Sequence, residues 1–176
     1  IKQDTLENQV KIVYLSLGSN LGDKFKNIDL AKYKLQLKGV KIIRSSSNYK
    51  SLSWPNPKNP KFINIVLKVR TFSSPFNLLK ICKNIEKQLG RVRSVKNEPR
   101  TCDIDIIDYN GEIIDSYDLI IPHPKSHLRN FVIYPLKEIE PNWLHPVFNK
   151  KIDSFFLELD KNSHNEITRL GKSDIL

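Results

Sequence analysis

Methionine is absent from the 176-residue sequence, and cysteine occurs only at Cys82 and Cys102. The two cysteines form no C-x-x-C pair and are too few for a structural zinc site, so we expect two reduced thiols, as in a cytoplasmic protein. No apolar run approaches the length of a membrane-spanning helix, and the polar first ten residues carry no secretory signal pattern. Because it lacks an initiator methionine, we expect the chain to be trimmed or cut from a longer polypeptide.

Several nucleotide-binding signatures are also missing. The sequence contains no G-x-x-x-x-G-K-[ST] and neither of the kinase motifs H-R-D and D-F-G, which excludes a P-loop enzyme and a protein kinase of the usual type. Positive charge, by contrast, is plentiful: 29 Lys and Arg against 19 Asp and Glu give a net charge of +10. This balance suits a polyanionic partner, which could be nucleic acid, a membrane surface or a nucleotide triphosphate.

The hydrophobic pattern predicts one α+β domain. It indicates strands at 11–20, 40–51, 62–71 and 101–110, and helices at 25–39 and 73–90. The strand at 62–71 alternates so that one of its faces is apolar. The helix at 73–90 is expected to open at a serine or at Pro75 and to close at Gly90. The order strand, helix, strand, strand, helix, strand is that of a ferredoxin-like βαββαβ core, an antiparallel sheet with helices on one face. "GEII" after the fourth strand is expected to form a short hairpin arm, and further helical segments follow. We expect the domain to cover 11–160, with terminal extensions at 1–10 and 161–176.

The stretch "PRTCDIDIIDYN" places three aspartates in an apolar, strand-like run. Because residues i and i+2 project to the same face of a strand, Asp103 and Asp105 should lie side by side, with isoleucines on the other face. Asp108 falls outside this register and is expected to be a polar residue at the strand's end. Two adjacent carboxylates repel unless a cation neutralises them, and oxygen ligands suit Mg²⁺. The alternative is an ordinary solvated face.

Five cationic side chains accompany the aspartate pair in the sequence: Arg91, Arg93, Arg100, His123 and Arg129. Guanidinium groups bind phosphate oxygens through paired hydrogen bonds, so carboxylates for a metal together with arginines suit phosphoryl transfer. Each arginine taken singly could equally be a surface charge.

A third group could bind a flat ring. Trp54, Phe62, Asn64 and Phe131 lie in or beside predicted loops, and aromatic faces with one amide can sandwich and recognise a heterocycle. The alternative is ordinary packing. The turn "LGSNLGD" before the first helix either presents backbone N–H groups to an anion or is a plain turn capped by Asn20.

Five blocks of the sequence resemble the 6-hydroxymethyl-7,8-dihydropterin pyrophosphokinase family: YLSLGSNLGD (14–23), FINIV (62–66), IEKQLGRVR (85–93), PRTCDIDIID (99–108) and IPHPKSHLRNFVIYPLKEIEP (121–141). They occur in order and at the expected spacing. Any one block would be weak evidence for the family, but five blocks in register are specific. The resemblance implies a ferredoxin-like fold. It also implies transfer of pyrophosphate from ATP to the hydroxymethyl group of the dihydropterin, with release of AMP, in folate biosynthesis.

The resemblance further implies roles for individual residues. Asp103 and Asp105 would hold two Mg²⁺ ions, and Arg91 and Arg100 would be catalytic. Contacts to ATP are implied for Glu86, Arg93, Ile106, His123 and Arg129. A pterin pocket is implied for Ser51, Leu52, Trp54, Phe62, Asn64 and Phe131. In this pocket the two phenylalanines would stack on the ring's faces and Asn64 would hydrogen-bond to its edge.

The sequence departs from the family pattern near this site. Many relatives carry Trp-Gly before the Pro-Arg, where "NEPR" stands here in a loop one residue shorter, so the usual aromatic over the site is missing. Many also have Thr-Pro at Ser51 and Leu52, and some have an arginine at Asp118. The loops 52–61 and 91–100 are candidate lids that close after ATP binds.

An alternative function remains open from the sequence: a non-catalytic, basic ferredoxin-like module that binds RNA. Against it, the sequence has no strand of the K/R-G-F/Y-G/A-F type, and a face bearing Asp103 and Asp105 would repel phosphate without a metal. We therefore expect ATP and a dihydropterin as partners, and neither nucleic acid nor a membrane. The chain could also be fused to, or work beside, other folate-pathway enzymes.

Overall fold

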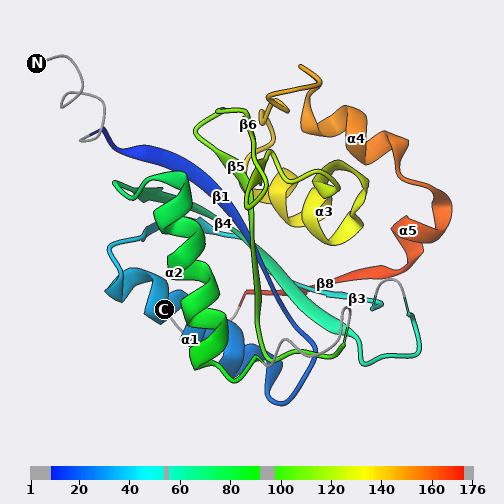
Figure 1. Ribbon diagram of the computed structural model, residues 1–176. Helices are drawn as coiled ribbons and strands as arrows, with labels where there is room; N and C mark the ends of the chain where they lie inside the picture. Colours follow the sequence, from blue (N-terminus) through cyan, green and yellow to red (C-terminus); the bar gives the residue numbers. More distant parts are fainter. Residues whose placement is uncertain (1–8, 54–55, 92–97, 173–176) are drawn as a thin grey trace, which may run out of the picture.

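The computed structural model describes residues 9–53, 56–91 and 98–172, and Figure 1 shows its elements in order. The strands are β1 (Lys11–Ser19), β2 (Lys41–Ser45), β3 (Asn48–Ser51), β4 (Phe62–Thr71), β5 (Asp103–Tyr109), β6 (Ile114–Asp115), β7 (Ile120–Ile121) and β8 (Ile167–Gly171). The helices are α1 (Lys24–Leu37), α2 (Pro75–Gln88), α3 (Asn130–Ile139), α4 (Ile152–Glu158) and α5 (Lys161–Asn165), with a 3₁₀ turn at Ser126–Leu128.

The main sheet is antiparallel, with the strand order β5-β1-β4-β3-β8, and β2 also pairs with β4. This confirms the predicted antiparallel α+β core. The predicted single strand at 40–51 is interrupted at Ser46 and Ser47. There, Val66 N donates to Ser46 Oγ at 3.0 Å, and Ser47 N donates to the Glu138 carboxylate at 3.1 Å. Side chains thus supply part of the hydrogen bonding at the break, beside the backbone bond from Ser46 N to Val66 O at 3.0 Å.

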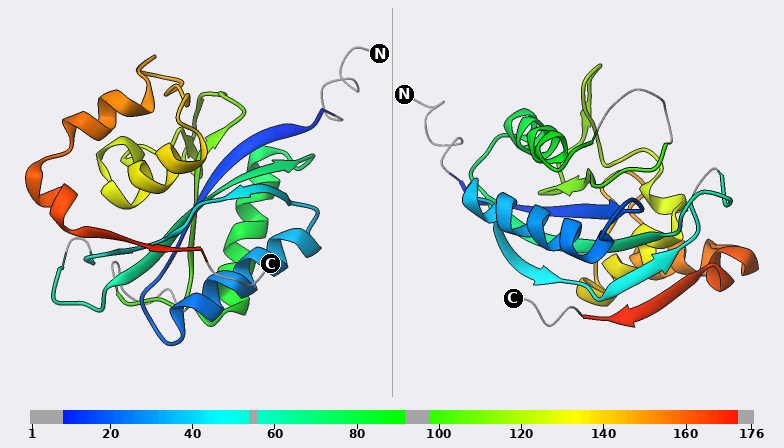
Figure 2. Two further views of the ribbon diagram at one scale, coloured as in Figure 1. Left: turned by 180° about the vertical axis from the view of Figure 1, so that it is seen from behind. Right: turned by 90° about the horizontal axis from the view of Figure 1, so that it is seen from below.

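Helices cover both faces of the sheet (Figure 2). On one face, α1 and α2 pack on a core that includes Leu15 and Ile65, as the sequence predicted. On the other face, α3 and α4 pack on a second core around Val66 and Leu136. The two helices of the predicted core thus lie on one face, while α3 and α4, which follow that core in the chain, cover the other face. For the same reason β4, predicted to have one apolar face, is buried on both faces over most of its length.

The ends of the helices follow ordinary capping chemistry. Ser74 caps α2, Pro75 is its first residue, and Gly90 follows with a φ of +86°, as predicted. The cap of α1 is Asp23, whose Oδ1 accepts from Lys26 N at 3.1 Å, so the alternative of a turn capped by Asn20 is wrong. Among the described helices, none combines the length and apolar character that crossing a membrane requires.

The C-terminal elements join the main sheet. Residues 161–176 were expected to form a terminal extension, but α5 and β8 lie there, and β8 pairs antiparallel with β3 (Figure 2). The strand is short and largely exposed, so its sequence carried no strand signal. The hairpin arm after β5 also differs from its prediction, because β6 pairs with β7 in a separate two-stranded sheet.

Candidate active site

The strand register brings two groups of predicted site residues onto the α3 face of the sheet. Asp103 on β5 pairs with Gly18 on β1, and Gly18 pairs with Asn64 on β4. Neighbouring strands are about 4.8 Å apart, so about 10 Å separates the backbones of Asp103 and Asn64. Asp105 lies in the next row of the same face, opposite Ser16. The predicted metal pair and the predicted pterin-binding amide thus share one surface.

Asp108 also lies on this face, but it is a buried structural residue. The pairing of β1 with β5 skips Ile107, which makes a β-bulge and turns Asp108 to the same side as Asp105. The Asp108 carboxylate accepts from Trp143 Nε1 and from Gly111 N, both at 2.8 Å. The prediction that Asp108 falls outside the register of the pair was wrong, because simple alternation does not reveal a bulge.

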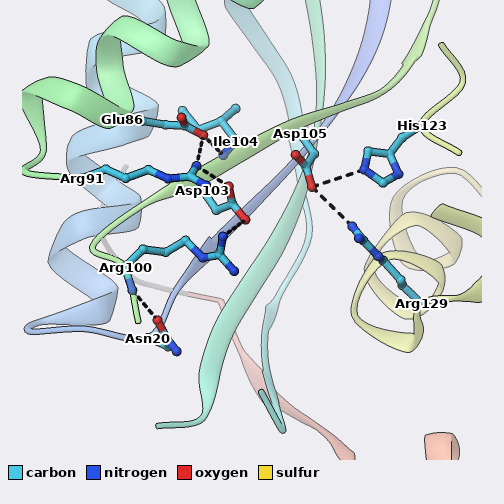
Figure 3. A network of polar contacts seen from close by, with 9 residues as sticks. All are labelled: Asn20, Glu86, Arg91, Arg100, Asp103, Ile104, Asp105, His123 and Arg129. Atoms are coloured by element: carbon cyan, nitrogen blue, oxygen red, sulfur yellow. Dashed lines mark hydrogen bonds and ion pairs between the residues drawn. The ribbon is translucent and has the colours of Figure 1, made fainter. Parts of the chain in front are cut away.

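Two arginines hold Asp103 (Figure 3). Arg91 Nη1 contacts Asp103 Oδ1 and, at 2.6 Å, Glu86 Oε1, while Arg100 Nη1 lies 3.4 Å from Asp103 Oδ2. Glu86 is buried, and its Oε1 also accepts from Ile104 N at 2.8 Å. Glu86 therefore reaches the site through Arg91, which favours a supporting role over the predicted direct contact with ATP.

Asp105 faces a second pair of nitrogen-bearing side chains. Its Oδ2 lies 3.4 Å from Arg129 Nη1 and 3.7 Å from His123 Nε2. Burial, and then the charge of Asp103, raise the pKa of Asp105. Burial, and then Arg129, lower the pKa of His123 to about 4, so His123 is neutral at pH 7. Because its Nδ1 accepts from Lys125 N at 3.2 Å, the ring proton is placed on Nε2, toward Asp105.

The predicted ring-binding residues on β3 and β4 form a second cluster. Asn64 Nδ2 donates to Ser51 Oγ at 2.9 Å, and both side chains are buried. The Arg100 guanidinium carbon lies 5.6 Å from the centre of the Phe62 ring. Phe62 and Asn64 stand on β4, where Phe62 is the first residue after the predicted loop 52–61.

The remaining predicted residues are distributed around this cluster. Phe131 lies in the first turn of α3, with the Arg129 guanidinium carbon 5.6 Å from its ring centre. Leu52 follows β3 and is half-buried. The side chain of Ile106 is buried in the core, so any contact with ATP must come from its backbone. Two further predicted residues, Trp54 and Arg93, lie outside the described part of the chain, and so do parts of both predicted lids.

Asn20 also shapes the site, although the sequence pattern did not indicate it. Asn20 N donates to Arg100 O at 3.1 Å, and Asn20 Oδ1 accepts from Arg100 N at 2.7 Å. Its Nδ2 donates to Pro60 O at 3.1 Å. Asn20 thus ties together the backbones that lead into β4 and β5. Since these partners lie 40 and 80 residues away in the sequence, no local pattern could reveal them.

Gly18 was missed as well, although a small residue inside a strand often marks a close approach. A Cβ atom at Gly18 would lie 2.9 Å from Asn64 Oδ1 and 3.3 Å from Phe62 Cδ1. We expect Gly18→Ala to displace both side chains and to raise the KM for the dihydropterin that the sequence resemblance implies about ten-fold, in the range of overpacking costs. The KM for ATP serves as the control. Steady-state kinetics with an unchanged pterin KM would contradict this.

The two aspartates could hold a metal ion. In the described ranges, no three or more His, Cys, Asp or Glu side chains converge as in a zinc site. Mg²⁺, however, usually takes one or two carboxylates together with substrate phosphates. Asp103 and Asp105 are partly exposed, with 26% and 36% of their side chains accessible. An oxygen-only pair open to solvent fits this ion.

Comparison with known proteins identifies the family. The family described as 7,8-dihydro-6-hydroxymethylpterin-pyrophosphokinase matches residues 14–141. The chain belongs to this family. The resemblance seen in the sequence is thereby confirmed.

Individual relatives show how much of each related protein this chain covers. It is 45% identical to the folic acid synthesis protein FOL1 of Dictyostelium discoideum, over 88% of this chain but 24% of that protein. The 2-amino-4-hydroxy-6-hydroxymethyldihydropteridine pyrophosphokinase of Aquifex aeolicus is 42% identical, over 81% of this chain and 89% of that protein. A crystal structure of Plasmodium falciparum HPPK-DHPS has the same fold, with a TM-score of 0.70 at 17% identity, over 92% of this chain and 48% of that chain. The chain thus spans about a quarter of the longer relative and most of the shorter one.

Proposed function

We propose that this chain transfers a pyrophosphoryl group from ATP to the hydroxymethyl oxygen of 6-hydroxymethyl-7,8-dihydropterin, with AMP as the leaving group. The observation that carries the proposal is the position of Asp103 and Asp105, side by side among arginines and two strands from the buried Asn64. The residues proposed to bind phosphate and the amide proposed to bind the pterin ring are therefore close enough to contact one small substrate at the same time.

The polar end of the pterin pocket is defined by the orientation of Asn64. Its amide nitrogen is committed to Ser51, which leaves Oδ1 over Gly18 as an acceptor. An amide oxygen in that place accepts hydrogen bonds from the N–H groups on the edge of a pterin. Phe62 and Phe131 supply aromatic surface for the ring, since both belong to the α3 side of the sheet.

The arginines supply charge for the phosphates. Arg91, Arg100 and Arg129 contact carboxylate oxygens here, and a guanidinium binds phosphate oxygens in the same way. The hydroxymethyl oxygen attacks the β-phosphorus while the bond to the α-phosphate oxygen breaks, and the arginines stabilise the charge that spreads over the group. Mg²⁺ ions held by Asp103 and Asp105 would neutralise phosphate charge and orient the hydroxyl group.

Metal dependence tests the proposal. We expect one AMP for each dihydropterin consumed when Mg²⁺ is present, and loss of AMP formation after chelation by EDTA, because the carboxylate pair repels triphosphate without a cation. AMP release can be followed by chromatography. Equal AMP formation with and without EDTA would contradict the metal assignment.

Titration calorimetry tests the predicted lids. A non-hydrolysable ATP analogue is added with Mg²⁺, and the dihydropterin follows. Pterin binding that requires the nucleotide supports closure of the loops after ATP binds. The same pterin affinity without nucleotide removes the case for ordered closure.

The names of the longer relatives bear on the cellular setting. Those proteins are named for folic acid synthesis, and this chain spans about a quarter or less of them. The proposal therefore includes work beside other enzymes of the same pathway. Domain limits of 11–160 and a cytoplasmic location stay predictions.

A further inference from the structure

One side of α3 carries three polar residues at a spacing of four: Asn130, Tyr134 and Glu138. Residues at this spacing lie above one another on a helix, so the three form a polar stripe. The first two bond to α5. Asn130 Nδ2 donates to Ser163 O at 2.7 Å, and Tyr134 Oη lies 2.7 Å from His164 Nδ1.

The third residue of the stripe bonds to the edge of the sheet. Glu138 accepts from Tyr49 Oη at 2.7 Å on β3 and from Arg169 Nη2 at 3.2 Å on β8. It also accepts from Ser47 Oγ at 2.9 Å at the break before β3. The polar stripe therefore connects α3 with β3, α5 and β8 along its length.

The connected C-terminal elements lie beyond the residues that the family model matches, which end at 141. Helix α5 has five residues, and none of them is buried. A helix without a buried face contributes little to the core, so its polar contacts with α3 need another explanation.

The start of α3 supplies that explanation. Arg129 occupies the cap position and makes no side-chain cap bond, although a capped helix start is worth about 1 kcal/mol. Asn130 is the first helical residue, between Arg129, which contacts Asp105, and Phe131. The bond from Asn130 to α5 thus anchors the helix turn from which both site residues project.

We propose that Asn130 is a positioning residue, which uses the Ser163 carbonyl to hold the first turn of α3 and so to orient Phe131 toward the dihydropterin. The C-terminal segment then takes part in pterin binding without touching the substrate. This inference rests on the proposed function, since that function assigns the ring-stacking role to Phe131. Small displacements of a substrate-holding group have large kinetic effects.

The test is Asn130→Ala in the full chain. We expect the pterin KM to rise about five-fold, the ratio given by loss of one ordinary hydrogen bond. The ATP KM and kcat should stay within about two-fold, because Arg129 keeps its own contact with Asp105. Tyr134→Phe, which removes the second bond to α5, should shift the pterin KM in the same direction. Pterin affinity measured by calorimetry gives an independent readout.

Lys137→Ala is the matched control. It removes an ion pair of the same helix with Asp153 on α4, about two turns beyond Asn130, rather than a bond to α5, and should leave the pterin KM unchanged. A wild-type pterin KM in Asn130→Ala, with or without a lower Tm, would show that the contact between Asn130 and Ser163 is merely structural. That result would overturn the inference and leave the proposed function intact. An equal rise in Lys137→Ala would also overturn it. A wild-type chain that binds no pterin would overturn the proposed function together with the inference.

Discussion

Asp105→Ala is expected to lower kcat by more than about 100-fold, while the protein stays folded. This loss is larger than the one typical for a residue that only hydrogen-bonds to a metal ligand. The reason lies in the geometry of β5. Asp105 and Asp103 are the carboxylates that face the arginines, and burial together with Asp103 makes the charge of Asp105 unfavourable. Removing it should leave the protein folded, because 36% of the Asp105 side chain is exposed, but should remove half of the metal-binding pair. Asp103→Ala is expected to have the same effect on turnover.

A third aspartate on the same strand provides the control. Asp108→Ala leaves the Trp143 and Gly111 N–H groups without their acceptor, which should lower the free energy of unfolding by about 1–3 kcal/mol. Turnover per folded molecule should be unchanged. Urea unfolding and steady-state rates measure the two effects separately. Full activity in Asp105→Ala, or a loss of activity in Asp108→Ala equal to that in Asp105→Ala, would refute the assignment.

Glu86→Ala is expected to lower the free energy of unfolding by about 3–5 kcal/mol, the usual cost of removing one partner of a buried ion pair. Glu86 is 3% exposed, and its carboxylate accepts from both Arg91 and Ile104 N. Without Glu86, the guanidinium of Arg91, whose side chain is only 16% exposed, loses a partner. Of its two carboxylate partners, Arg91 would then keep only Asp103. Since Arg91 is a predicted catalytic residue, turnover should fall as well.

An exposed glutamate, Glu158, serves as the control for the loss of stability expected in Glu86→Ala. Glu158 pairs with Lys150 at 2.8 Å, but both side chains are more than half exposed. Glu158→Ala should therefore change the free energy of unfolding by less than about 1 kcal/mol. Denaturant titration of the two variants measures the difference. If Glu86→Ala were no less stable than Glu158→Ala, the supporting role of Glu86 would be wrong.

The aspartate pair could be predicted because its signal is local. Strand periodicity alone places Asp103 and Asp105 on one face, and in the structure they lie there together. The capped ends of α2 are equally local and were also predicted correctly. Burial of Glu86 and the contacts of Asn20 were not predictable in this way, since each depends on partners that folding brings from distant parts of the chain.

The α3 side of the sheet was the least predictable part of the fold. The second core joins β4 with α3 and α4, so the alternation within β4 could not show that both of its faces are buried. The bulge at Ile107 likewise depends on how β5 pairs with β1, and it decides where Asp108 points. The strand β8 is too short and exposed to be seen without its neighbour β3.

By itself, the sequence determined the order of the core elements, the chemistry of the carboxylate and arginine groups, and the resemblance that identifies the family. These follow from periodicity and from residue types at short spacing. Only the tertiary structure decided that Asp103, Gly18 and Asn64 form one row across three strands. It also decided that α5 bonds to the first turn of α3. Both arrangements depend on strand register and on contacts between distant segments, which exist only once the chain has packed.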